Sequence, residues 1–162
     1  MFTAGIITVS DKGSQGKRED LSGPAIAEML AGAAIEIKQT LIIPDEKDQI
    51  QKAIVNFADV EKLDLILTTG GTGVSPRDLT PDATLAVIDK EVPGMAEAMR
   101  AASLRKTPHA VLSRARTGIR GRSLIINLPG STKAARENIE VLLPALPHAL
   151  DKIQGGTSDC GR

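Results

Sequence analysis

Residues 63–73 have the sequence LDLILTTGGTG, a short apolar run that passes directly into a glycine-rich turn. Such a run is typical of a strand buried on both faces, as in a parallel sheet. Similar apolar runs occur at residues 4–9, 35–43 and 124–128, and residues 110–119 form a candidate extended segment. The sequence therefore predicts several short strands, most of them inside one sheet.

Helical patterns separate these runs. We expect helices at residues 22–34, 46–60, 95–104, 131–143 and 146–153, and another that starts at Thr80. Ser22, Thr80 and Ser131 are the expected N-caps, because a hydroxyl oxygen can accept a hydrogen bond from the free amides of a first turn. Strands that alternate with such helices favour crossover connections. The predicted fold is a single-domain, three-layer α/β/α fold with a mainly parallel sheet over residues 1–155, followed by a flexible tail at 156–162.

The composition argues against nucleic-acid binding. The 162 residues include 20 basic and 20 acidic side chains, so there is no positive surplus to neutralise nucleic-acid phosphates. Two Phe and no Trp or Tyr provide no aromatic platform for stacking bases, and they require an aliphatic core.

Compartment and membrane association can also be predicted. No segment approaches the ~20 continuous apolar residues of a membrane span. The first residues lack the basic and apolar regions of a secretory signal. Cys160 is the sole cysteine, so an intrachain disulfide is excluded. We therefore expect a cytoplasmic protein with no membrane partner.

Four predicted loops are expected to meet at one edge of the sheet. Each follows an apolar run, and they span residues 10–16, 44–48, 70–78 and 129–133. Ligands of open α/β sheets bind beyond the carboxyl ends of the strands, where such loops gather. These loops are rich in glycine, hydroxyl and acidic side chains. That composition is typical of a site for a polar ligand that carries phosphate.

The loop Gly70–Gly73 is the strongest candidate for phosphate binding. Glycine adopts positive φ and lets backbone amides approach a phosphate closely. Thr69 and Thr72 add hydroxyl donors, and Arg77 adds a charged fork. The loop has neither the Lys-Ser/Thr pair of a phosphate loop nor G-x-G-x-x-G, so an ordinary tight turn is the alternative interpretation. A second candidate anion site at a predicted helix start comprises Pro129, Gly130 and Ser131.

Two carboxylates in these loops are candidate metal ligands. Asp45 follows the second apolar run, and Asp78 closes the glycine loop. Carboxylates would repel a phosphate unless a divalent cation such as Mg²⁺ bridges them. The alternative is that Asp45 is a turn residue and Asp78 a loop partner of Arg77. Asp11 is a third candidate, although Asp is common in turns.

These motifs together resemble the molybdenum-cofactor biosynthesis family, the MogA/MoaB group, which includes the G domain of gephyrin. The central match is TTGGTG at 68–73 with Arg77-Asp78 and TPDA at 80–83. Further matching segments are TVSD at 8–11, SGP at 22–24, PD at 44–45, PG at 93–94, LSR at 112–114, LPGS at 128–131 and LPALPHA at 143–149. The resemblance extends from about Phe2 to Gly155. The segment at 128–133 is similar to the MoaB and gephyrin versions, whereas that at 44–46 is similar to the MogA version.

The resemblance implies adenylyl transfer from MgATP, the co-substrate, to the terminal phosphate of molybdopterin, with release of pyrophosphate. The family's two reactive aspartates fall on Asp45 and Asp78, which we expect to hold Mg²⁺. Phosphate binding is expected from Thr69, Gly70, Gly71, Thr72, Gly73, Pro129, Gly130 and Ser131. Substrate binding is expected from Ser10, Asp11, Ser75, Arg77 and Ser113.

The resemblance also implies partners. Similar proteins are trimers and some relatives are hexamers, so we expect a homotrimer, with a hexamer as the alternative, whose product passes to a downstream molybdate-insertion protein. The alternative is a protein of the same pathway that binds or carries molybdopterin without catalysis. The retained Asp45 and Asp78 favour the enzyme, since a carrier needs no metal-binding carboxylates.

Overall fold

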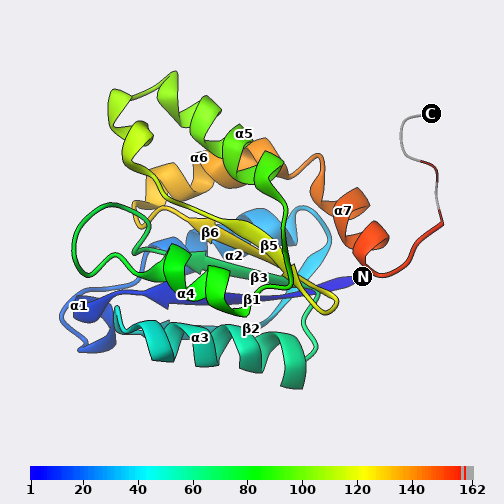
Figure 1. Cartoon of the computed structure of the whole chain (residues 1–162), viewed down its shortest axis with the longest axis horizontal. Helices are drawn as coiled ribbons and strands as arrows, with labels where there is room; N and C mark the ends of the chain where they lie inside the picture. The colour runs from blue at the N-terminus through cyan, green and yellow to red at the C-terminus, as the bar shows by residue number, and fades with distance from the viewer. Residues whose placement is uncertain (158, 160–162) are drawn as a thin grey trace.

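Six strands form one sheet in the order β2-β1-β3-β6-β5-β4 (Figure 1). The structure is a computed structural model that describes residues 1–157 and 159. Cys160 and much of the predicted tail at 156–162 lie outside the described residues. The strands are β1 (Phe2–Val9), β2 (Ile35–Ile43), β3 (Leu65–Thr69), β4 (Lys90–Glu91), β5 (Thr117–Arg120) and β6 (Ser123–Leu128).

The sheet is mainly parallel. β1 pairs with β2 and β3 in parallel, and β3 pairs with β6 in parallel. Only β5 runs against its neighbours, since it is antiparallel to both β6 and β4. The carboxyl ends of β2, β1, β3 and β6 therefore lie side by side at one edge, as the sequence predicted.

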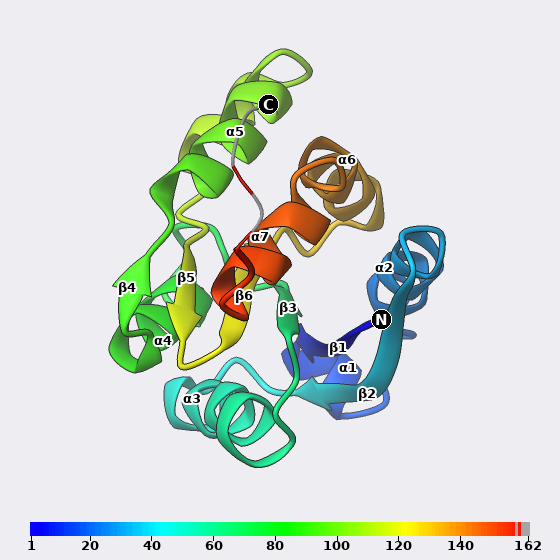
Figure 2. The ribbon, with the colours of Figure 1, turned by 90° about the vertical axis from the view of Figure 1, so that its right-hand side faces the viewer.

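Helices cover both faces of the sheet (Figure 2). Buried residues of α2 (Ser22–Ala31), α5 (Pro93–Leu104), α6 (Thr132–Leu142) and α7 (Leu146–Ile153) pack on one face. Those of α3 (Lys47–Val55), the π-helical turn η1 (Asn56–Val60) and α4 (Thr80–Val87) pack on the other. Both core clusters consist mostly of Ile, Leu and Ala, and Phe57 is the one aromatic residue buried in them among the described part of the chain. This arrangement confirms the three-layer α/β/α prediction.

Several local predictions need correction. Residues 110–119 are not continuously extended, because the 3₁₀ turn η2 (Pro108–Leu112) precedes β5. Ser22 and Thr80 are not N-caps but the first residues of their helices. Their hydroxyl groups donate instead to the carbonyl oxygens of Gly130 and Gly70, both at 2.9 Å. Each hydroxyl group therefore donates a hydrogen bond to a backbone carbonyl of another segment, instead of accepting one from an amide of its own helix.

The helix expected at 46–60 changes character part-way. It is α-helical in α3 and becomes a π-helical turn from Asn56. The predicted cap of α6 is confirmed, since Ser131 Oγ accepts a hydrogen bond from the amide of Ala134. Within the part of the chain that is described, no helix has the length and apolar character needed to cross a membrane.

Candidate functional site

A cavity of about 630 Å³ opens at the carboxyl edge of the sheet. Its walls come from all four regions that the sequence placed there. Of the predicted site residues, those lining it are Ser10, Asp45, Thr69, Gly70, Gly71, Gly130 and Ser131. Residues 18–22 and Thr132 also line the cavity, and none of them is among the predicted site residues. Predicted phosphate-binding groups from separate loops therefore face a shared space.

The glycine loop begins with two residues of positive φ. Gly70 has φ of 103° and Gly71 has φ of 67°, a region that side chains with a Cβ disfavour. A Cβ on Gly70 would overlap the carbonyl oxygen of Val9, and one on Gly71 would lie 2.5 Å from the hydroxyl oxygen of Thr80. Glycine is therefore required here by conformation and by the close approach of β1 and α4.

The carbonyl oxygens of this loop are bound from two sides. Thr80 donates from its hydroxyl to Gly70 (2.9 Å) and from its amide to Gly71 (3.2 Å). Arg114 donates from its amide to the carbonyl of Thr72 and from Nε to that of Gly73, both at 2.8 Å. Arg114 Nη2 also reaches the carbonyl of Asp78, at 2.6 Å. The loop is thus held in place by hydrogen bonds to its backbone carbonyl groups.

The amides of the same loop remain available. Within the described residues, the backbone N–H groups of Gly71, Thr72 and Gly73 donate to no protein acceptor. Successive unpaired amides beside a cavity form a concave site that favours an anion. The helix α6 begins across the same cavity, and its first amides add positive potential there.

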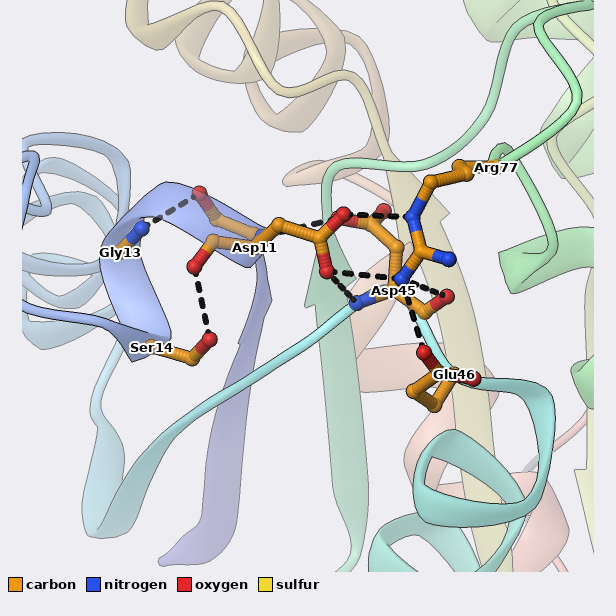
Figure 3. Close-up of polar contacts among 7 residues, drawn as sticks. Asp11, Gly13, Ser14, Asp45, Glu46 and Arg77 are labelled. Carbon is orange, nitrogen blue, oxygen red and sulfur yellow. Dashed lines mark hydrogen bonds and ion pairs between the residues drawn. The ribbon is translucent and has the colours of Figure 1, made fainter.

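Asp11 and Asp45 form a reciprocal pair (Figure 3). Asp45 Oδ2 accepts a hydrogen bond from the amide of Asp11 (2.9 Å), and Asp11 Oδ1 accepts one from the amide of Asp45 (3.0 Å). This exchange fixes the loop after β1 against the loop after β2. Asp45 Oδ1 accepts no hydrogen bond from the described residues, so one oxygen of this carboxylate stays available.

Arg77 ties the glycine loop to that pair (Figure 3). Its guanidinium donates to both carboxylate oxygens of Asp11, at 2.6 and 3.0 Å. It also donates to the backbone carbonyl of Asp45 (3.2 Å) and to Glu46 Oε1 (2.9 Å). In this structure the guanidinium is thus engaged with protein groups, whereas the sequence predicted that it binds substrate.

The two aspartates of the pair titrate differently. Hydrogen bonding to Arg77 lowers the pKa of Asp11, whose carboxylate is stabilised in its charged form. Burial raises the pKa of Asp45, and the negative charges of Asp11 and Asp78 raise it further. The Asp45 and Asp78 carboxylates both lie against the glycine loop, since a Cβ on Gly71 would lie 3.1 Å from Asp45 Oδ1 and one on Gly73 would lie 2.8 Å from Asp78 Oδ2.

Asp78 closes the glycine loop by a local contact. Its Oδ2 accepts a hydrogen bond from the amide of Ser75 at 3.0 Å. The alternative prediction of an Asp78–Arg77 side-chain pair is wrong, because Arg77 is bound to Asp11 and Glu46. No group of three or more His, Cys, Asp or Glu side chains that could hold a metal is present among residues 1–157 and 159.

A second hollow of about 270 Å³ adjoins the glycine loop at Thr72 and Gly73. Of the predicted site residues, it is lined by Thr72, Gly73, Ser113 and Pro129. Its remaining lining residues are Arg100, Ser103, Thr107, His109, Ala110, Leu112, Ala134 and Asn138. The predicted residues that line neither space are Asp11, Ser75, Arg77 and Asp78, which lie in or brace the surrounding loops.

The fold and this edge of the sheet can be compared with known proteins. A family model described as "Probable molybdopterin binding domain" matches residues 5–148. The chain belongs to this family. Membership confirms the resemblance seen in the sequence, and the match includes both loops that flank the glycine loop at the cavity.

Members of the molybdopterin-binding family are similar over nearly the whole chain. A molybdopterin adenylyltransferase of Helicobacter pylori (strain ATCC 700392 / 26695) is 46% identical over 153 residues, 93% of this chain and 87% of that protein. The molybdopterin adenylyltransferase of Escherichia coli (strain K12) is 45% identical over 139 residues, which are 84% of this chain and 71% of that protein. The crystal structure of MoaB from Thermus thermophilus, a molybdopterin biosynthesis enzyme, matches with a TM-score of 0.91 and 56% sequence identity. The match covers 96% of this chain and 98% of the MoaB chain.

Proposed function

We propose that this protein is a molybdopterin adenylyltransferase, which transfers AMP from ATP to the terminal phosphate of molybdopterin and releases pyrophosphate. The similar adenylyltransferases described above support the activity. The observation that carries the site assignment is the cavity, which is lined by Gly71 with its unpaired amide, by the start of α6 and by Asp45 with an available carboxylate oxygen. Such a set of groups suits ligands with several phosphates.

In the proposed reaction, an oxygen of the molybdopterin phosphate attacks the α-phosphorus of ATP. The new P–O bond forms as the bond between the α-phosphorus and the oxygen that bridges it to the β-phosphorus breaks. Pyrophosphate leaves with that oxygen and with the electron pair of the broken bond. Reactions of this kind depend on positioning and charge neutralisation, so no protein nucleophile is needed. The amides of Gly71–Gly73 and the start of α6 would bind and orient phosphate oxygens.

Asp45 and Asp78 fit the Mg²⁺ that such a reaction implies. Asp45 offers a free oxygen beside the cavity, and the negative charge of Asp78 raises the pKa of Asp45. Mg²⁺ is commonly held by one or two carboxylates, with substrate phosphates and water completing its shell, so three protein ligands are not required. When bound, it would supply positive charge that offsets the phosphates.

The second hollow is the proposed position of the pterin. It adjoins the glycine loop at Thr72 and Gly73, and its lining includes apolar contributions from Ala110, Leu112 and Pro129. A planar heterocycle suits such a hollow. Nucleotide and pterin would then contact different residues of the glycine loop, with their phosphates meeting at it.

The function is tested by incubating purified protein with molybdopterin, ATP and Mg²⁺ under anaerobic conditions. Adenylylated molybdopterin and an equal amount of pyrophosphate are expected. Saturable binding of molybdopterin without pyrophosphate release would contradict the proposed enzymatic activity and support the alternative of a molybdopterin carrier. We also propose a homotrimer whose product passes to a molybdate-insertion protein, and sedimentation analysis tests the assembly.

The pH dependence of the reaction should report on Asp45. If ionised Asp45 is needed, activity falls as the pH is lowered through the pKa of this group. Because burial raises that pKa above its ordinary value of 3.8, the acid limb of kcat/KM should lie above pH 3.8. Asp11 should not produce this limb, since its pKa is lowered. An acid limb at or below 3.8, with the fold intact by circular dichroism, would contradict the assignment.

Replacing Arg77 by Lys should reduce kcat/KM by roughly tenfold, as is common for residues that hold a ligand of a metal site. An ammonium group cannot reproduce the fork that contacts Asp11 and Glu46 together. Arg122→Lys is a matched control at the opposite edge of the sheet, where Arg122 donates to Gln154. Equal activity of the two variants would show that the Arg77 fork is dispensable.

A further inference from the structure

Arg100 on α5 lines the second hollow with a guanidinium that is only partly used. Its Nη1 donates to the carbonyl oxygens of Ala115 (2.9 Å) and Ser113 (3.5 Å). Its Nε and Nη2 make no hydrogen bond with the described residues, and no described carboxylate forms an ion pair with it. The side chain nevertheless lies at a half-buried position.

Neighbouring arginines differ from Arg100 in this respect. Arg114 pairs with Asp82 and Arg116 with Glu91, each at 3.0 Å, while Arg77 binds Asp11. A cation removed from water without a carboxylate partner is unfavourable, so such a group usually has another anion to meet. Of these four arginines, Arg100 is therefore the one that forms no ion pair with a described carboxylate, although Asp82 lines a neighbouring hollow with it.

The hollow beside Arg100 is suited to an anionic ligand with a flat apolar body. Within the described part of the chain, its lining includes no Asp or Glu. Ala110, Leu112, Pro129 and Ala134 provide apolar surface. Because Thr72 and Gly73 also line it, a ligand seated there reaches the glycine loop.

We infer that Arg100 binds an anionic group of molybdopterin other than the phosphate that reacts, namely the sulfur-bearing dithiolene side of the pterin. This inference rests on the proposed function and deepens it. Arg100 is then a substrate-positioning residue that distinguishes molybdopterin from a simple phosphate ester. Its delocalised, weakly hydrated guanidinium suits a soft, delocalised anion.

A structural role is the competing explanation, because Nη1 braces the segment that carries Arg114. The variant Arg100→Gln separates the two roles. Its carboxamide carries no charge and ends two bonds short of Nη1, so the variant removes the charge together with the contacts to Ser113 and Ala115, and the melting temperature reports on the structural part. We expect KM for molybdopterin to rise about 10- to 100-fold, the range for a lost hydrogen bond to a charged group. KM for ATP and the melting temperature should not change.

Arg105→Gln is the matched control. Arg105 terminates the same helix, is exposed, and lines neither the cavity nor the second hollow. The variant changes the net charge equally, so its KM for molybdopterin should remain that of the unmodified protein. A rise equal to that of Arg100→Gln would assign the effect to overall charge and overturn the inference.

Direct binding gives a readout that does not depend on catalysis. Equilibrium binding of molybdopterin without ATP, under anaerobic conditions, should be weakened by Arg100→Gln. Inorganic phosphate should compete equally against both proteins, and weaker competition in the variant would show that Arg100 binds phosphate instead. An unchanged Kd, or a rise in both KM values with a lower melting temperature, would also overturn the inference. Weakened binding in a protein that releases no pyrophosphate would refute only the proposed function.

Discussion

Asp45→Asn is expected to lower kcat for adenylylation by at least about 100-fold, the scale for removing one preorganised electrostatic group at a reacting phosphate. Asn can still accept the hydrogen bond from the amide of Asp11, so the loop pairing should persist. It cannot supply the negative charge with which Asp45 is proposed to hold Mg²⁺. The loss should therefore appear in kcat and in the Mg²⁺ dependence, measured as pyrophosphate release.

The same variant should be at least as stable as the unmodified protein at neutral pH. The folded-state pKa of Asp45 is raised by burial, so its contribution favours folding below the ordinary value of 3.8 and is lost as the pH rises through the raised pKa. The neutral amide removes that cost. Asp48→Asn, on the exposed first turn of α3, is the control and should retain activity. Activity of Asp45→Asn within about tenfold of the control would refute the catalytic assignment.

Gly70→Ala is expected to reduce the free energy of unfolding by about 3 kcal/mol or more. Positive φ alone costs an alanine about 1–2 kcal/mol. The added Cβ would also overlap the carbonyl oxygen of Val9, which belongs to a central strand and cannot move freely. Urea unfolding measures the loss, and adenylylation should fall with it because the loop is displaced.

Gly94→Ala provides the comparison for that measurement. Gly94 lies in the first turn of α5, has no positive φ, and has open space where a Cβ would be. Alanine there should leave stability unchanged or raise it by up to about 1 kcal/mol. If Gly70→Ala lost less than about 1 kcal/mol, the loop would be more adaptable than its geometry indicates.

The fold could be predicted because local patterns of apolar residues indicate which segments are buried. The apolar run that became β3 lies between helices and the run that became β6 is followed by one, and parallel pairing of the two then places the following loops at one edge. The expected meeting of Asp45, the glycine loop and Ser131 around one space follows from that topology alone. Chain order was sufficient for this much of the candidate site.

The hydrogen bonds that brace the site could not be predicted, because they go to backbone carbonyl groups, which every residue has. Arg114 and Thr80 bind backbone carbonyls of the glycine loop, and no side-chain pattern marks those carbonyls in advance. Arg77 was expected at the ligand, yet its partners Asp11 and Glu46 come from two other loops. Which of several possible anions an arginine meets is decided by tertiary distances.

The first strand and the last helix have a consequence for how this protein can be extended. Phe2 begins β1 at the edge opposite the cavity, and α7 ends nearby, where Gln154 binds Asp64 and Arg122 (Figure 1). Both ends of the folded body thus face away from the cavity. A tag, a surface tether or a second enzyme could be fused at either end without obstructing the mouth of the cavity, which makes the fold a convenient module for assembling consecutive steps on one polypeptide.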